Sequence, residues 1–226
     1  MIRLALLRHG PTAWSRAHRL QGRADVPLDA AGRAAVSGWS LPPELTAWAW
    51  RTSPLLRCQE TARLLDLAAA TDDRLIEMDW GAWEGRSLRA IAAEEPAALA
   101  AREARGIHMT PPPGPATDCG AGSSESPAMV MARLAPLLAA VAAAGRDCGF
   151  VTHKGVIRAL LALATDWDMT GPPPARVAPG SLQLLALDGR RLRLLAADLA
   201  LNGRPLPVPQ PAAPGPTPRA GPRGGP

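Results

Sequence analysis

Two of the four histidines follow directly on apolar runs of the kind that form buried strands. His9 comes after Ile2–Leu7 and Arg8, and His153 comes after Cys148–Thr152. In an open α/β sheet, ligands bind beyond the carboxyl ends of the strands. The first run therefore places the Arg8 guanidinium and the His9 imidazole where a ligand would bind, and the second places the His153 imidazole there. Taken alone, each histidine could be a hydrogen-bonded core residue, but the two together favour one shared site.

Arg57 stands in a similar position after a third run. Thr46–Thr52 is expected to be a strand, and Ser53 and Pro54 give an N-cap and a proline at the first position of a helix that runs to about Leu65. Free N–H groups and the macrodipole at a helix N-terminus attract anions. A guanidinium in the first turns adds planar, bidentate recognition of phosphate oxygens. The chemistry that these residues support is the handling of a phosphate group.

Segment 77–85 holds three acids and two tryptophans, and it begins within an expected strand over Arg74–Met78. A carboxyl group among bulky apolar side chains has a raised pKa, which a general acid at neutral pH requires. The alternative is an acidic turn beside two core tryptophans. The pattern alone leaves three candidates for the acid, Glu77, Asp79 and Glu84.

These side chains must be positioned by regular elements, and the chain alternates strand-like and helix-like segments. The alternation predicts an α/β fold, a three-layer α/β/α sandwich with a mostly parallel central sheet. Leu182–Asp188 and Arg191–Ala196 flank Gly189 and predict a β-hairpin, and the Pro- and Gly-rich stretch Thr110–Ser124 predicts a loop. The other expected elements are helices over Ala30–Trp39 with Asp29 as cap, over Leu88–Glu95 with Ser87 as cap, from Ser126-Pro127 to about Ala144, and over Gly155–Leu163.

The 226 residues fit one domain with an extension. The motifs lie within residues 1–201, whereas residues 202–226 are mostly Pro, Gly, Ala and Arg, a composition that predicts disorder. The formal net charge is +5, but three of the arginines and no acid lie in the extension, which leaves +2 for the domain. A nucleic-acid binder needs clustered positive charge, so we do not expect nucleic acid as a partner.

Cys58, Cys119 and Cys148 are an odd number without metal-ligand spacing, which is typical of reduced cytosolic thiols. The strand-like N-terminal run is too short for a secretory signal. No apolar run is expected to reach membrane-spanning length. We therefore expect a cytoplasmic protein that does not bind membranes.

Five segments, in order from about residue 1 to 200, resemble the histidine phosphatase (phosphoglycerate-mutase-like) superfamily, and its phosphatase branch in particular. Each motif alone is modest, and five in the family's order are specific. They are Arg8-His9-Gly10 with Thr12, Trp14 and Gln21-Gly22; Ser53-Pro54-Leu55-Leu56-Arg57 with Glu60-Thr61-Ala62; Glu77 with Gly81, Glu84 and Gly85; Ser124-Glu125-Ser126 ahead of Arg133; and Thr152-His153-Lys154-Gly155-Val156-Ile157-Arg158-Ala159.

The resemblance implies a catalytic domain of the phosphoglycerate-mutase-like fold over residues 1–201, with His9 as the nucleophile that becomes phosphorylated. Arg8, Arg57 and His153 would bind the phosphoryl oxygens. Glu77 would protonate the leaving oxygen and then help to deprotonate the attacking water. Two arginines and a protonated histidine supply positive charge around the transferring group, so neither a metal nor another cofactor is expected.

The resemblance also places Gln21 and Gly22 at the mouth of the site. Ser15 stands where the family often has Asn, and Lys154 where a small residue is frequent. Both are expected to bind substrate, although Lys154 could instead point to solvent.

The leading hypothesis is a phosphomonoesterase that hydrolyses a small phosphorylated metabolite through a phosphohistidine. A cofactor-dependent phosphoglycerate mutase is one alternative, and a catalytically idle domain that binds a phosphorylated ligand is another. The expected partner is a small phosphorylated substrate. The oligomeric state stays open, with a homodimer as one option.

Overall fold

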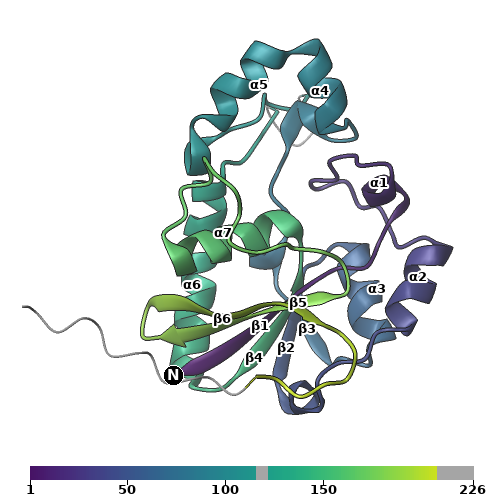
Figure 1. Ribbon diagram of the computed structural model, residues 1–226, viewed down its shortest axis with the longest axis vertical. Coiled ribbons are helices and arrows are strands. Elements are labelled where there is room, and N and C mark those ends of the chain that lie inside the picture. The colour runs from purple at the N-terminus through teal and green to yellow at the C-terminus, as the bar shows by residue number, and fades with distance from the viewer. Residues whose placement is uncertain (116–121, 208–226) are drawn as a thin grey trace, which may run out of the picture.

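The computed structural model describes residues 1–115 and 122–207, which form a six-stranded sheet with helices on both faces (Figure 1). The strands, in spatial order, are β3 (Ala69–Thr71), β2 (Ala49–Thr52), β4 (Cys148–Thr152), β1 (Ile2–Arg8), β5 (Ser181–Asp188) and β6 (Arg191–Ala200).

The sheet is mixed and mostly parallel, as the alternation of segments predicts. β1 pairs in parallel with β4, β4 with β2, and β2 with β3. β5 runs antiparallel to β1 and pairs with β6 in the expected hairpin, whose turn follows Asp188 and contains Gly189 at φ +59°. That left-handed conformation favours glycine.

The central strand β1 is buried on both sides of the sheet, which is why it reads as a continuous apolar run. Leu4 and Leu6 face a core cluster that includes residues of α6 (Pro127–Ala144) and α7 (Lys154–Thr165). Ala5 and Leu7 face a second cluster that includes residues of α3 (Leu56–Leu64). Because successive side chains of a strand point to opposite faces of the sheet, β1 packs against helices on both sides.

The two helical layers complete the expected three-layer sandwich (Figure 1). α6 and α7 cover one face, and α3 covers the other with α2 (Ala30–Ser37) beside it. α4 (Leu88–Glu94) and α5 (Pro96–Glu103) stand apart at the top of Figure 1, over a small core of Trp83, Ile91 and Leu99. The remaining short elements are α1 (Ala13–Arg16) and the 3₁₀ turns Pro43–Ala47, Asp73–Leu75, Gly81–Trp83 and Gly106–His108.

Three of the predicted helix caps are confirmed. The side chains of Asp29, Ser87 and Ser126 each accept a hydrogen bond from a backbone N–H in the first turn of the helix that follows. The fourth is wrong, because α3 begins at Leu56 and the Ser53 hydroxyl is bound by His153 at 2.7 Å. The carboxylate of Asp25 instead accepts from the Leu56 N–H at 2.7 Å.

The predicted strand over Arg74–Met78 is also wrong. Asp72 caps a 3₁₀ turn over Asp73–Leu75, and the chain then continues without regular structure. The carbonyl of Leu75 accepts from the Thr152 hydroxyl at 2.8 Å, and that of Ile76 accepts from the Arg133 guanidinium at 2.7 Å. The carbonyls of this segment thus accept hydrogen bonds from side chains instead of from the backbone of a neighbouring strand. The edge strand β3, three residues of Ala and Thr, was not expected at all.

α6 is long and apolar enough to cross a membrane by length and composition. The expectation that no segment reaches that length is therefore wrong. Val130, Leu134, Leu137 and Val141 of this helix are buried in the core beside the sheet. These residues form the face of α6 that packs inside the domain.

The C-terminal end of the described chain is partly packed, which differs from the disorder expected from residue 202 onward. Leu206 is buried in the α3-side core, and its N–H donates to Glu44 at 3.3 Å. Residues 208–226 lie outside the described residues. Cys119 and part of the expected loop 110–124 do so too, because residues 116–121 are not described. Cys58 and Cys148 are free and buried; a cytoplasmic location stays a prediction.

Candidate active site

The carboxyl ends of three parallel strands bring the first site residues together. The His9 N–H donates to the Thr152 carbonyl at 2.9 Å, and the Ser53 N–H donates to the Val151 carbonyl at 3.0 Å. These bonds continue the sheet one residue past its strands, so His9, Ser53 and His153 lie along one edge. The rings of His9 and His153 are 5.3 Å apart between centroids.

His9 is held as a neutral imidazole with a defined tautomer. Its Nδ1 lies 2.7 Å from the carbonyl oxygen of Gly10. A carbonyl only accepts, so Nδ1 carries the proton and Nε2 keeps a free lone pair. Burial, with Arg8 and Arg57 nearby, lowers the pKa of His9 well below its usual value. The ring is therefore unprotonated at neutral pH, the form in which an imidazole has a lone pair available for attack.

Arg57 is fully buried, although it is charged. Its two terminal nitrogens donate to the carbonyls of Gly22 at 2.7 Å and Ala24 at 2.8 Å, and its Nε donates to His153 Nδ1 at 3.3 Å. Burial lowers its pKa, but an arginine keeps its charge at any ordinary pH. The guanidinium is thus a fixed positive charge in the first turn of α3.

His153 is held between Ser53 and Arg57. Because the Arg57 Nε–H donates to Nδ1, the other ring nitrogen carries the proton and donates to the Ser53 hydroxyl at 2.7 Å. Burial and the neighbouring Arg57 lower the pKa of His153 well below its usual value. To donate from Nδ1 to a bound anion, the ring must take up a proton, and the charge of that anion would favour this.

Glu77 is the one of the three candidate acids that lies at the histidines. Its two carboxylate oxygens accept from the backbone N–H of Met78 at 2.8 Å and of Gly155 at 3.2 Å. Burial raises its pKa, although those two bonds and the charges of Arg57 and Arg8 oppose the shift. This is the environment that keeps part of a carboxyl population protonated.

The other two acids hold loops. Glu84 accepts from the backbone N–H groups of Arg23 at 2.8 Å and Ala24 at 3.1 Å. Asp79 accepts from the Gly81 N–H at 2.8 Å and from the Ser123 hydroxyl. The structure thus distinguishes the three candidate acids by their contacts, which the residue pattern alone could not do.

Arg8 completes the positive side of the site. One terminal nitrogen donates to the Val177 carbonyl at 3.0 Å, and its Nε is buried without a hydrogen-bond partner among the residues that the structure describes. Burial lowers its pKa, and Glu77 is the strongest group that opposes this. A buried N–H without a partner is costly, so a bound oxyanion would satisfy a group that the free site leaves open.

Comparison with known proteins agrees with this geometry. Residues 4–199 match the histidine phosphatase superfamily (branch 1). The chain belongs to that superfamily. A mycobacterial glucosyl-3-phosphoglycerate phosphatase in complex with VO3 shares 28% sequence identity and a TM-score of 0.67, covering 88% of this chain and 100% of that one.

Curated relatives of this histidine phosphatase superfamily member match over shorter stretches. A bifunctional protein of Mycobacterium tuberculosis is 38% identical over 122 residues, 51% of this chain and 33% of the relative. A probable phosphoglycerate mutase of Yersinia enterocolitica is 33% identical over 107 residues, 42% of this chain and 46% of the relative. The match thus spans less than half the length of either relative.

The four proposed substrate-binding residues have different surroundings. Gln21 is buried and accepts from the Thr12 hydroxyl at 2.9 Å, and the Gly22 carbonyl is bound by Arg57. The Ser15 hydroxyl is engaged in a capping box with Thr12. Lys154 is exposed at the start of α7; its pKa is lowered by the protein around it and by nearby Arg8 and Arg158.

Arg133 holds the acid's segment, a role that the motif alone did not assign. Its guanidinium donates to the carbonyls of Arg74 and Ile76, just before Glu77. It also pairs with Glu125 at 2.9 Å, and the Glu125 N–H donates to the Asp79 carbonyl at 2.9 Å. Only contacts between distant segments show this, so no local pattern could have found it.

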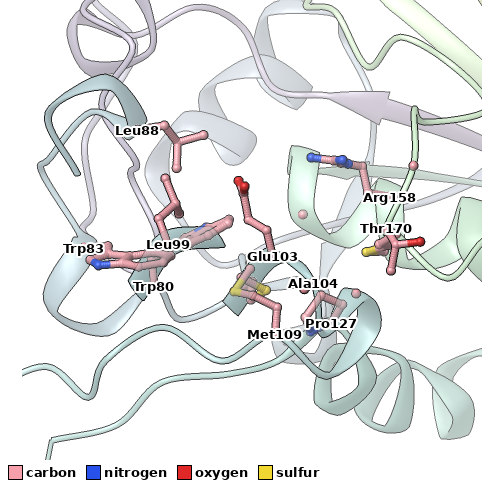
Figure 2. Close-up of a pocket in the computed structure, with 15 residues that line it drawn as sticks. Trp80, Trp83, Leu88, Leu99, Glu103, Ala104, Met109, Pro127, Arg158 and Thr170 are labelled. Carbon is pink, nitrogen blue, oxygen red and sulfur yellow. The ribbon is translucent and has the colours of Figure 1, made fainter. Parts of the chain in front are cut away.

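Figure 2 shows a cavity, about 400 Å³ in volume, that borders the candidate site. Its lining includes Met78 and Gly155, the two residues whose N–H groups hold the Glu77 carboxylate, together with Trp80 and Arg158. Within residues 1–115 and 122–207, no group of three or more His, Cys, Asp or Glu could hold a metal ion. Independence from metals stays a prediction.

Proposed function

We propose that this protein is a phosphomonoesterase that hydrolyses a small phosphorylated metabolite through a phosphohistidine on His9. One observation carries the proposal: a neutral His9, its Nε2 free, lies beside Arg8, Arg57 and His153, with the buried acid Glu77 nearby. A nucleophile, an oxyanion clamp and a proton donor are the parts that phosphoryl transfer through a covalent intermediate needs.

In the first step, His9 Nε2 attacks phosphorus and the bond from phosphorus to the ester oxygen breaks. Arg8, Arg57 and a protonated His153 stabilise the charge on the phosphoryl oxygens. Glu77 gives its proton to the departing oxygen, so an alcohol leaves and Glu77 becomes a carboxylate. The hydrogen bond from Nδ1 to the Gly10 carbonyl keeps the ring in place as Nε2 is phosphorylated.

In the second step, water attacks the phosphohistidine. The Glu77 carboxylate accepts a proton from that water, and the bond from phosphorus to Nε2 breaks. Inorganic phosphate leaves, and His9 and the protonated Glu77 are regenerated. The same carboxyl group acts as acid and then as base, which a raised pKa permits.

The test is hydrolysis of 4-nitrophenyl phosphate in the presence of EDTA by the wild type and by His9→Ala. We expect activity that survives EDTA and is lost in the variant. Activity that persists in His9→Ala would exclude the histidine as nucleophile. An idle phosphate-binding domain would turn over neither this ester nor a wide panel of metabolites.

Similarity to a probable phosphoglycerate mutase favours one second candidate. A mutase would return the phosphoryl group from His9 to another hydroxyl instead of to water. Interconversion of 3-phosphoglycerate and 2-phosphoglycerate that outpaces the release of phosphate would show that activity.

A further inference from the structure

The cavity borders the segment that holds the Glu77 carboxylate. Met78 and Gly155 line it, and their N–H groups hold the two oxygens of the Glu77 carboxylate. A group that receives the proton of Glu77 must lie within hydrogen-bonding reach of that carboxyl. The rest of the leaving alcohol would then extend into this cavity, whose volume of about 400 Å³ fits a small metabolite.

Two charged side chains of the described residues line this cavity, the cation Arg158 and the anion Glu103. The Arg158 Nε is buried without a hydrogen-bond partner, and within the described ranges its guanidinium forms neither an ion pair nor a hydrogen bond. Its Cζ lies over the Trp167 ring, 5.0 Å from the ring centroid, which is a cation–π contact. Burial lowers its pKa, and no acid offsets the shift. Lys154, one helical turn earlier on α7, adds positive charge to the same face.

The opposite wall is aromatic and apolar. Trp80 and Trp83 stack with 6.4 Å between ring centroids, and Leu99 lies beside them. Figure 2 shows these rings at one side of the cavity and the Arg158 guanidinium at the other, with the Glu103 carboxylate pointing into the space between. A flat or apolar group therefore meets rings at one end, and an anion meets a guanidinium at the other.

We infer that the leaving alcohol of the substrate carries an anionic group that Arg158 binds, next to an apolar or ring portion that lies against Trp80. This deepens the proposed function and depends on it. A carboxylate and a second phosphate are the two anions that a guanidinium binds in a bidentate manner. Arg158 is thus a specificity residue for the part of the substrate that does not react.

The test compares three aryl esters: phenyl phosphate, 3-carboxyphenyl phosphate and 1,3-phenylene bisphosphate. Hydrogen bonds to charged groups account for roughly 10- to 100-fold in affinity. We expect the wild type to show a kcat/KM about 10-fold or more higher for at least one anionic ester, and the better one identifies the anion. Arg158→Gln should remove that advantage, mainly through KM, because the contact is made equally in ground and transition states.

Phenyl phosphate provides the internal control, because its hydrolysis by Arg158→Gln should stay within about threefold of the wild type if the variant is folded. Arg146→Gln alters an exposed arginine outside the cavity lining and should change none of the three rates. An equal loss on all three esters, or no preference in the wild type, would overturn the inference and leave the proposed function standing. Failure of the wild type to hydrolyse any ester would contradict both.

A second variant tests the apolar wall. Trp80→Ala should lower kcat/KM for 3-carboxyphenyl phosphate about 10-fold while changing that for 2-phosphoglycolate, which has an anion but no ring, much less. Equal effects on the two substrates would contradict the placement of a ring against Trp80.

Discussion

The Glu77 carboxylate fills the space beside the backbone of Gly155. A Cβ at residue 155 would lie 2.4 Å from Glu77 Oε1, and the Gly155 N–H donates to Oε2 at 3.2 Å. The residue two positions after His153 thus helps to position Glu77, the proposed proton donor. Glycine here is required by close approach rather than by an unusual backbone conformation.

Gly155→Ala should therefore displace the acid. We expect kcat to fall at least about 10-fold for an alkyl phosphate with little change in KM, because the phosphate clamp is untouched. Gly38→Ala is the matched control, since the nearest atoms to a Cβ there are Ala35 O at 3.4 Å and Ala34 O at 3.8 Å. Steady-state kinetics check this, and unchanged kcat in Gly155→Ala would show that Glu77 has more freedom than its contacts indicate.

The role of Glu77 as acid should be visible in the leaving-group dependence. Glu77→Gln should slow hydrolysis of β-glycerophosphate on the order of a hundredfold or more. The effect on 4-nitrophenyl phosphate should be much smaller, because its anion leaves without a proton. Equal losses on the two esters would assign Glu77 a structural role instead.

The pH profile follows from the same groups. The raised pKa of Glu77 extends its acid form to higher pH, so kcat/KM should fall as pH rises past that pKa, and Glu77→Gln should lack this limb. The lowered pKa of His9 keeps the nucleophile neutral near pH 7, and activity should fall only as pH drops well below 6.5. Ionisation of the substrate is common to both enzymes, so their difference isolates Glu77. A limb that persists in Glu77→Gln would contradict the assignment.

Arg57 should matter to both stability and catalysis. Lysine cannot reproduce its bonds to the carbonyls of Gly22 and Ala24 and to His153 at once. Each buried carbonyl left without a partner costs about 1–3 kcal/mol. Arg57→Lys should therefore lower the free energy of unfolding, measured with urea, and reduce kcat/KM about a hundredfold. Arg63→Lys, at an exposed position of α3, is the control.

The sequence predicted the parts of the site that depend on strand ends. His9 and His153 follow the apolar strands β1 and β4, which are buried on both faces and can therefore be recognised from composition alone. Ser53 follows the shorter strand β2, in which Ala49 is exposed. The position of Glu77 was expected on a strand that does not exist, because its neighbours are held by Thr152 and Arg133 from elsewhere in the chain. Contacts of this kind leave no local pattern.

The C-terminal boundary of the domain was also predicted incorrectly from sequence alone. The boundary at residue 201 rested on composition, yet Leu206 is buried beyond it. Deleting residues 202–226 should lower the free energy of unfolding by about 1.5–3 kcal/mol, the contribution of one buried leucine. Deleting only residues 208–226 should leave stability and activity unchanged. Denaturant titration of the two truncations checks this, and equal stability would contradict a contribution from Leu206.

The phosphohistidine can be observed directly. Wild-type enzyme mixed with a ³²P-labelled aryl phosphate and quenched in alkali within milliseconds should carry label on His9, stable in base and labile in acid. Peptide mass spectrometry should place it there, and Glu77→Gln should accumulate more of it, because loss of the base slows the attack of water. Label absent from an enzyme that turns over the ester, or label on another residue, would contradict covalent catalysis by His9.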